Sequence, residues 1–158
     1  MFKFDHADKK LLQALQANCR LTSDQLSEAC GLSPTAALKR VKQLRSEGVI
    51  TKEVAVIAPK KVGLNVLAIV MVTLERESKH TIDSFKKDIR KAEQIVNGYY
   101  VTGDADFVLT IAVSSMDDYE EFTRDFFYDR HKIKSFKTLV VLDPVKTHAQ
   151  LPINFMAE

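Results

Sequence analysis

Residues 33–43 combine side chains that could bind another molecule at the start of a helix. Small and cationic or amide residues share this run: Ser33, Thr35, Ala36, Lys39, Arg40, Lys42 and Gln43. Small residues allow a helix to approach a groove floor, and Lys, Arg and Gln can bond to phosphates and base edges. Ser33, with the free amides of a helix N-terminus, can also receive a phosphate. This chemistry predicts contact with double-stranded DNA, with an ordinary solvated helix face as the alternative.

A second candidate site is the run Thr102-Gly103-Asp104-Ala105-Asp106. Glycine permits a tight turn whose exposed backbone amides can receive a small carboxylate. Asp104 or Asp106 can receive an ammonium group, so the run offers partners for both ends of a free amino acid. A hairpin turn that needs Gly and Asp but no ligand is the alternative.

Residue types used in catalysis and metal binding are scattered along the chain. The four histidines are His6, His80, His131 and His148, and the two cysteines are Cys19 and Cys30. No HExxH motif or phosphate-binding loop is present, and the cysteines form no paired CxxC motif. We therefore expect no catalytic residue, no metal site and no cofactor.

The elements that position the first site are predicted helices within residues 1–62. An apolar stripe of Leu11, Leu12 and Leu15 indicates the first helix, with Asp5 or Asp8 near its start. A second helix runs from an N-cap at Ser23 to Gly31, and a third runs from Ser33-Pro34 to about Glu47. The short glycine-containing turn between them predicts a helix-turn-helix motif over about residues 23–47.

The residues after Gly48 predict an extended arm and then a domain boundary. The run VITKEVAVIAP alternates and is rich in β-branched residues, which predicts a short extended segment ending at Pro59. It could act as a wing or hairpin arm with Lys52 near phosphate. Lys60, Lys61 and Gly63 form a short linker, so we expect a DNA-binding domain over residues 1–62 and a second domain over 63–158.

Charge and length agree with two small domains in one chain of 158 residues. Residues 1–62 hold 11 Lys/Arg against 6 Asp/Glu, whereas residues 63–158 hold 12 against 15. The first part is basic and suits a polyanion, and the second is acidic. The longest apolar run, Val66 to Val72, is too short to cross a membrane, and the charged N-terminus does not resemble a signal peptide. We expect a cytoplasmic protein without a membrane partner.

Residues 63–158 alternate between strand and helix patterns. The expected elements are strands over 66–74, 95–102, 107–113 and 133–142, and helices over 81–92 and from Ser115 onward. This βαββαβ order predicts a ferredoxin-like α+β sandwich. Because one face of such a sheet is left open, a second copy of the chain is the expected partner.

The ensemble of these motifs resembles the Lrp/AsnC (feast/famine) regulator family, and most closely its leucine-responsive branch. The resemblance covers about residues 4–147 and includes Gly31-Leu32-Ser33-Pro34-Thr35, Arg40-Val41, Gly48-Val49-Ile50, Val101-Thr102-Gly103-Asp104-Ala105-Asp106-Phe107 and Thr138-Leu139-Val140-Val141-Leu142. It implies a DNA-binding transcription regulator that forms dimers, often stacked into octamers, and senses a small effector, usually an amino acid. The implied effector residues are Tyr100, Thr102, Gly103, Asp104, Asp106, Thr138 and Leu139.

Two segments depart from the family pattern, and two other functions remain open. Residues 129–133 stand where relatives usually have a glycine-valine turn, and the tail from Leu151 to Glu158 is more apolar than expected. Some proteins with this layout resemble siroheme decarboxylases, so an enzyme is one alternative. An amino-acid-binding module without DNA function is the other, although Lys39, Arg40 and Lys42 argue against it.

Overall fold

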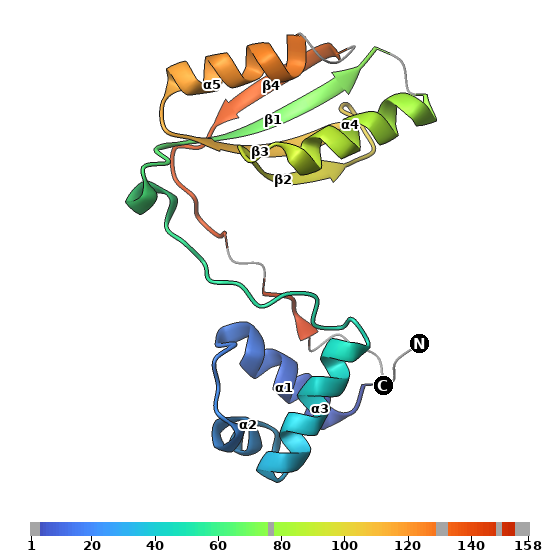
Figure 1. The fold of residues 1–158 in the computed structure, drawn as a ribbon, viewed down its shortest axis with the longest axis vertical. Helices are drawn as coiled ribbons and strands as arrows, with labels where there is room; N and C mark the ends of the chain where they lie inside the picture. Colours follow the sequence, from blue (N-terminus) through green and yellow to red (C-terminus); the bar gives the residue numbers. More distant parts are fainter. Residues whose placement is uncertain (1–3, 76–77, 129–132, 148–149, 154–158) are drawn as a thin grey trace. The chain divides into compact units, whose positions relative to one another are not determined.

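The computed structural model describes residues 4–75, 78–128, 133–147 and 150–153, and the chain divides into two compact units (Figure 1). The first unit contains Met1–Ala55 together with Lys146–Glu158, and the second contains Val56–Val145. The division therefore falls after Ala55 rather than after residue 62. The described part of the C-terminal tail, residues 150–153, belongs to the first unit rather than to the second.

Three helices build the first unit: α1 (His6–Ala17), α2 (Ser23–Cys30) and α3 (Pro34–Ser46). Gly31 ends α2 with a φ of 73°, and the Ser33 hydroxyl then caps α3. This arrangement confirms the predicted helix-turn-helix motif. The cap of α2 is Thr22, which accepts the backbone N–H of Gln25, rather than the predicted Ser23. Buried side chains from all three helices form the core: Leu11, Leu26, Cys30, Ala37 and Val41.

The extended segment predicted after Gly48 does not pair as a β-strand. Residues 51–58 have neither helix nor strand, and their apolar side chains are exposed, with Val54 at 68% and Val56 at 72%. An isolated strand leaves its backbone groups without partners, and no strand among the described residues pairs with this segment. Alternating β-branched residues are therefore not sufficient here to make a strand.

The apolar tail completes a small second core of the first unit. Ile153 is 8% exposed and packs with Leu12 of α1 and Leu44 of α3. The Gln16 side chain accepts the backbone N–H of Leu151 at 2.7 Å and donates to its carbonyl at 3.2 Å. These contacts give the first part of the departing tail a structural role, while residues 154–158 lie outside the described residues.

Replacing Ile153 with alanine is expected to destabilise the first unit by about 2 kcal/mol, because the change opens a cavity beside Leu12 and Leu44. Hydrogen exchange of the amides in α1 and α3 measures this loss within that unit. The matched control is Leu151→Ala, since that side chain is 70% exposed and its backbone bonds to Gln16 remain. Equal protection in the two variants would contradict a packing role for Ile153.

The second unit is an antiparallel sheet with two helices. Its elements, in chain order, are a 3-10 turn (Pro59–Val62), β1 (Val66–Leu74), α4 (Lys79–Lys91), β2 (Ile95–Tyr100), β3 (Phe107–Val113), α5 (Met116–Thr123) with a π-helical extension (Arg124–Tyr128), and β4 (Ile133–Val140). The strand order β2-β3-β1-β4 confirms the predicted ferredoxin-like fold. Of the departing segment 129–133, only Ile133 is described, as the first residue of β4.

Helices α4 and α5 cover one face of this sheet (Figure 1). Phe85 of α4 and Phe127 after α5 are buried in one cluster with Val70 and Val72 of β1. The intervening side chains of β1 lie on the opposite face. We call this the open sheet face, and its apolar residues are only partly buried or exposed: Leu67, Ile69, Met71, Val108 and Leu139.

Candidate nucleic-acid interface and effector loop

The start of α3 is fixed by local chemistry and leaves one side of the helix exposed. The Ser33 hydroxyl accepts the backbone N–H of Ala36 at 3.3 Å, and Pro34 occupies the first helical position. Ala37, Val41 and Leu44 are buried. The remaining predicted contact residues, apart from Arg40, are exposed, and we call them the exposed face of α3: Ser33, Thr35, Ala36, Lys39, Lys42 and Gln43.

A shallow groove of about 340 Å³ crosses this face and is lined by Leu32, Ala36, Lys39, Arg40 and Gln43. The small Ala36 leaves room for close approach, while Lys39 and Gln43 supply hydrogen-bond donors one helical turn apart. This combination suits a base edge flanked by phosphates. The structure therefore brings most of the predicted DNA contacts onto one surface.

Arg40 differs from the other predicted contacts because its guanidinium is engaged within the protein. Its Nη2 atom lies 2.9 Å from Asp5 Oδ2, and its Nη1 atom lies 3.4 Å from Asp8 Oδ2. Asp5 is the N-cap of α1 and Asp8 stands in the first turn of that helix. The Arg40 side chain thus reaches from α3 to the beginning of α1.

The carboxyl of Asp5 titrates below its ordinary range. The backbone N–H of Asp8 is the main cause of the lowered pKa, and the Arg40 charge acts in the same direction against a partial burial effect. A depressed folded-state pKa contributes stability above the unfolded value, and this contribution disappears as pH falls through the folded value.

Acidification below about pH 3.8, the ordinary pKa of the Asp5 carboxyl, is therefore expected to loosen the start of α1. Hydrogen exchange of α1 amides between pH 5 and pH 3 measures the effect. Asp5→Asn keeps a capping oxygen but does not titrate, so its exchange should depend less steeply on pH. Identical pH profiles in the two proteins would exclude this contribution.

The effector loop, residues 102–106, is a compact turn held to β1. Gly103 has a φ of 119°, a region that favours glycine. The Asp106 carboxylate accepts the backbone N–H of Leu74 at 2.7 Å, and the Asp106 N–H donates to the Val72 carbonyl. Asp106 is therefore committed to holding the loop. Thr102, Gly103 and Asp104 remain exposed.

The other predicted effector residues, Tyr100, Thr138 and Leu139, each have different immediate contacts. The Tyr100 ring lies 4.4 Å from the Lys86 ammonium. The Thr138 hydroxyl is 2.6 Å from that of Tyr119 under the helices, and burial raises the pKa of Tyr119. Leu139 lies on the open sheet face, where it pairs with Ile69. Thr138 pairs with Val70, whereas the loop bonds to Val72 and Leu74 further along β1.

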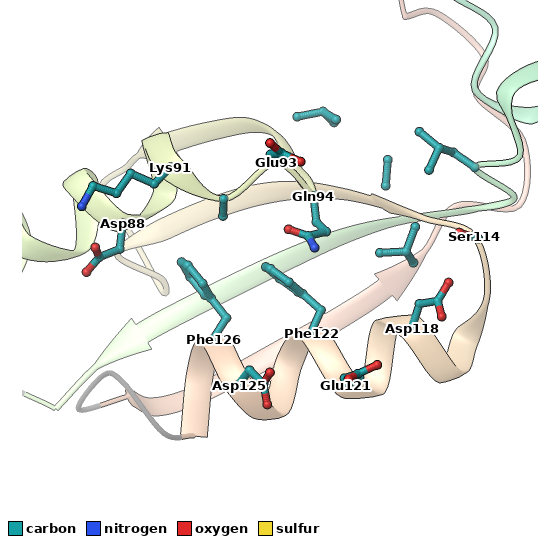
Figure 2. A pocket seen from close by; sticks show the side chains of 15 residues that line it. Asp88, Lys91, Glu93, Gln94, Ser114, Asp118, Glu121, Phe122, Asp125 and Phe126 are labelled. Carbon is teal, nitrogen blue, oxygen red and sulfur yellow. The ribbon is translucent and has the colours of Figure 1, made fainter.

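One groove of about 790 Å³ was missed by sequence reasoning. It lies between the end of α4, the start of β2 and α5, and Figure 2 shows Phe122 and Phe126 rising into it opposite Gln94. Its charged lining residues are Asp88, Lys91, Glu93, Asp118, Glu121 and Asp125. The spacing of Asp118 and Glu121 in α5 and Asp125 in its π-helical extension is the signal that could have revealed it. Five carboxylates against one ammonium make this groove unsuited to DNA.

Within the part of the chain that the structure describes, no helix could cross a membrane, and no group of three potential ligands could hold a metal ion.

Comparison with known proteins identifies both units. Residues 4–51 match a winged helix-turn-helix DNA-binding model, and residues 67–151 match the Lrp/AsnC ligand-binding domain. An HTH-type transcriptional regulator of Sinorhizobium fredii, y4tD, is 53% identical over 96% of this chain and 89% of its own. The leucine-responsive regulatory protein of Escherichia coli is 30% identical over 94% of this chain and 91% of its own.

A solved structure supports the same assignment. The transcriptional regulator NMB0573 of Neisseria meningitidis, crystallised as a complex with L-Met, has a TM-score of 0.90 and is 32% identical over 96% of this chain and 98% of its own. These similar proteins are named as transcriptional regulators, not as enzymes. This chain has the same two units, a helix-turn-helix unit followed by a ligand-binding unit, as these similar proteins. It belongs to the Lrp/AsnC family of transcriptional regulators.

Proposed function

We propose that this regulator binds double-stranded DNA through the exposed face of α3. The observation that carries the proposal is the groove along that face, where Ala36 allows close approach and Lys39 and Gln43 supply donors. Lys42 on the same side suits a flanking phosphate, and Ser33 and Thr35 stand at the helix N-terminus. Arg40 lies at the edge of this face.

The proposed effector is a free amino acid bound at the effector loop. The exposed Gly103 turn offers backbone amides for a carboxylate, and exposed Asp104 offers a partner for an ammonium group. Asp106 holds the loop in this form through its bond to Leu74. The L-Met complex of the Neisseria relative supports this ligand class. Tyr100, Thr102, Thr138 and Leu139 complete the proposed set, with contributions from more than one copy of the chain.

Self-association links the two activities. The open sheet face exposes apolar side chains that a second copy would cover, and a dimer presents two α3 helices to two DNA half-sites. Stacking of dimers into octamers would bring effector loops of different dimers together. An effector that binds one assembly better shifts the equilibrium, with a coupling energy of about 1–3 kcal/mol. In the cytoplasm, that shift would change which DNA spacings are bridged at once.

The experiment is DNA binding to the region upstream of the protein's own gene at fixed salt, with each of the twenty amino acids added in turn. Light scattering on the same samples gives the assembly size. We expect one amino acid to change both the footprint and the assembly, and Asp104→Asn to weaken that response.

Asp83→Asn, an exposed acidic position on α4, is the matched control and should respond normally. Failure to bind DNA at modest salt would overturn the DNA proposal. Binding of an amino acid that alters neither footprint nor assembly size would overturn the coupling.

A further inference from the structure

Arg40 is placed on α3 so that it can reach both carboxylates at the beginning of α1. Its two terminal nitrogens contact different residues, Asp5 at 2.9 Å and Asp8 at 3.4 Å. A planar guanidinium can bridge two carboxylates in this way, whereas a lysine ammonium provides a single charged point. The contact joins residues 32 and 35 positions apart in the sequence.

The same two carboxylates form the capping box of α1. Asp5 Oδ1 accepts the N–H of Asp8 at 2.8 Å, and Asp8 Oδ2 accepts the N–H of Asp5 at 3.1 Å. The backbone at the start of α1 therefore holds both side chains through bonds that do not involve Arg40. Arg40 binds to a rigid acceptor, so the contact constrains α3 rather than a mobile side chain.

The buried Asp8 side chain makes release of the Arg40 guanidinium energetically unfavourable. The side chain is completely buried, and its Oδ1 atom has no hydrogen-bond partner among the described residues. A buried carboxylate is tolerated when a cation or hydrogen bonds compensate its charge. Arg40 is the cation that contacts it here. Movement of the guanidinium toward DNA would remove this cation contact from the buried Asp8 side chain.

We infer that Arg40 is a positioning residue that fixes α3 against the start of α1 and does not contact DNA. The inference rests on the proposed DNA-binding role of α3 and deepens that role, because it assigns different functions to the basic residues of this helix. Lys39 and Lys42 meet the DNA, whereas Arg40 sets the orientation in which they are presented.

The salt dependence of DNA binding separates the two tasks. A lost phosphate contact lowers the slope of log K against log salt by about 0.9, whereas misplacement of the helix weakens binding without a comparable loss of slope. We expect Lys39→Met to lower the slope by that amount. Arg40→Met should weaken binding roughly tenfold while keeping the slope. A slope that falls by about 0.9 in Arg40→Met would overturn the inference.

Asp5→Asn tests the same contact with Arg40 intact. Asparagine keeps the capping oxygen of α1 but not the charge that Arg40 binds. If Arg40 only positions α3, the variant should bind DNA more weakly, although it carries one negative charge fewer. Asp24→Asn removes a charge from the exposed first turn of α2 and should not weaken binding. Tighter binding by Asp5→Asn than by Asp24→Asn would show that the carboxylates restrain a DNA-binding arginine, against the inference.

Two further measurements separate misfolding and a failed DNA proposal from a failed inference. Arg40→Met leaves Asp8 uncompensated, so Arg40→Met/Asp8→Asn should be the more stable variant in hydrogen exchange of α1. Arg40 guanidinium N–H signals in a ¹⁵N-labelled protein without DNA should be protected and should lose protection in Asp5→Asn. Unprotected signals in the unchanged protein would overturn the contact itself. Protected signals without any DNA binding would instead overturn the proposed function and, with it, the division of tasks.

Discussion

Replacing Lys39 and Lys42 together with alanine is expected to weaken DNA binding about 60-fold at about 0.1 M salt, since each lost phosphate contact removes about 0.9 from the salt slope. Both ammonium groups extend from the exposed side of α3, opposite the buried Ala37 and Val41. The change removes charge without removing a core contact, so the fold should persist.

The measurement is a titration of the same DNA fragment at several salt concentrations. The slope should fall by about 1.8 for the double variant and by half as much for either single variant. Lys87→Ala is the control, because Lys87 is exposed on α4 of the second unit and should leave the slope unchanged. An unchanged slope in the double variant would show that Lys39 and Lys42 do not contact DNA phosphates and that the DNA contact lies elsewhere than on α3.

Replacing Phe127 with alanine should destabilise the second unit by about 3–5 kcal/mol. The ring is 1% exposed and lies 4.8 Å from that of Phe136 and 5.3 Å from that of Phe126, measured between centroids. Its loss leaves a cavity where the π-helical extension meets β4. A loss of this size is a large fraction of the stability of a small domain.

Tyrosine fluorescence during urea unfolding reports on this unit alone, because all four tyrosines lie within it and the chain has no tryptophan: Tyr99, Tyr100, Tyr119 and Tyr128. Met116→Ala serves as the control, since that side chain is 51% exposed at the start of α5. Similar midpoints for the two variants would show that the Phe127 cluster contributes little.

The parts of the fold that follow from local sequence were predictable. The dipeptide Ser33-Pro34 predicts the start of α3. A hydroxyl side chain suits the N-cap, and a proline, which has no N–H, suits the first helical position. The run from Val66 to Leu74 is apolar except for Thr73, and it forms β1 with the predicted bounds. Gly103 likewise lies in a turn with positive φ. Each of these signals is complete within a few neighbouring residues.

Features that depend on distant partners were not predictable in the same way. A helical pattern places Arg40 near the exposed side of α3, but only the fold shows that Asp5 and Asp8 meet it. The pattern in residues 51–58 favours a strand, yet no described strand pairs with it. The acidic groove of about 790 Å³ forms only where the end of α4, the start of β2 and α5 come together. The effector site that we propose between copies of the chain would likewise depend on partners that are distant in the sequence.

The first unit is built from two stretches of the chain that the ribosome synthesises at different times, Met1–Ala55 and Lys146–Glu158. Ile153, which closes the small core beside Leu12 and Leu44, is separated from α3 by the entire second unit. The 90 residues of Val56–Val145 take about 5 to 20 s to translate. During that time the three helices lack the tail that packs against them. The DNA-binding unit is therefore the first unit to begin synthesis and the last to be completed. A nascent chain therefore acquires a fully packed DNA-binding unit only after its ligand-binding unit has been made.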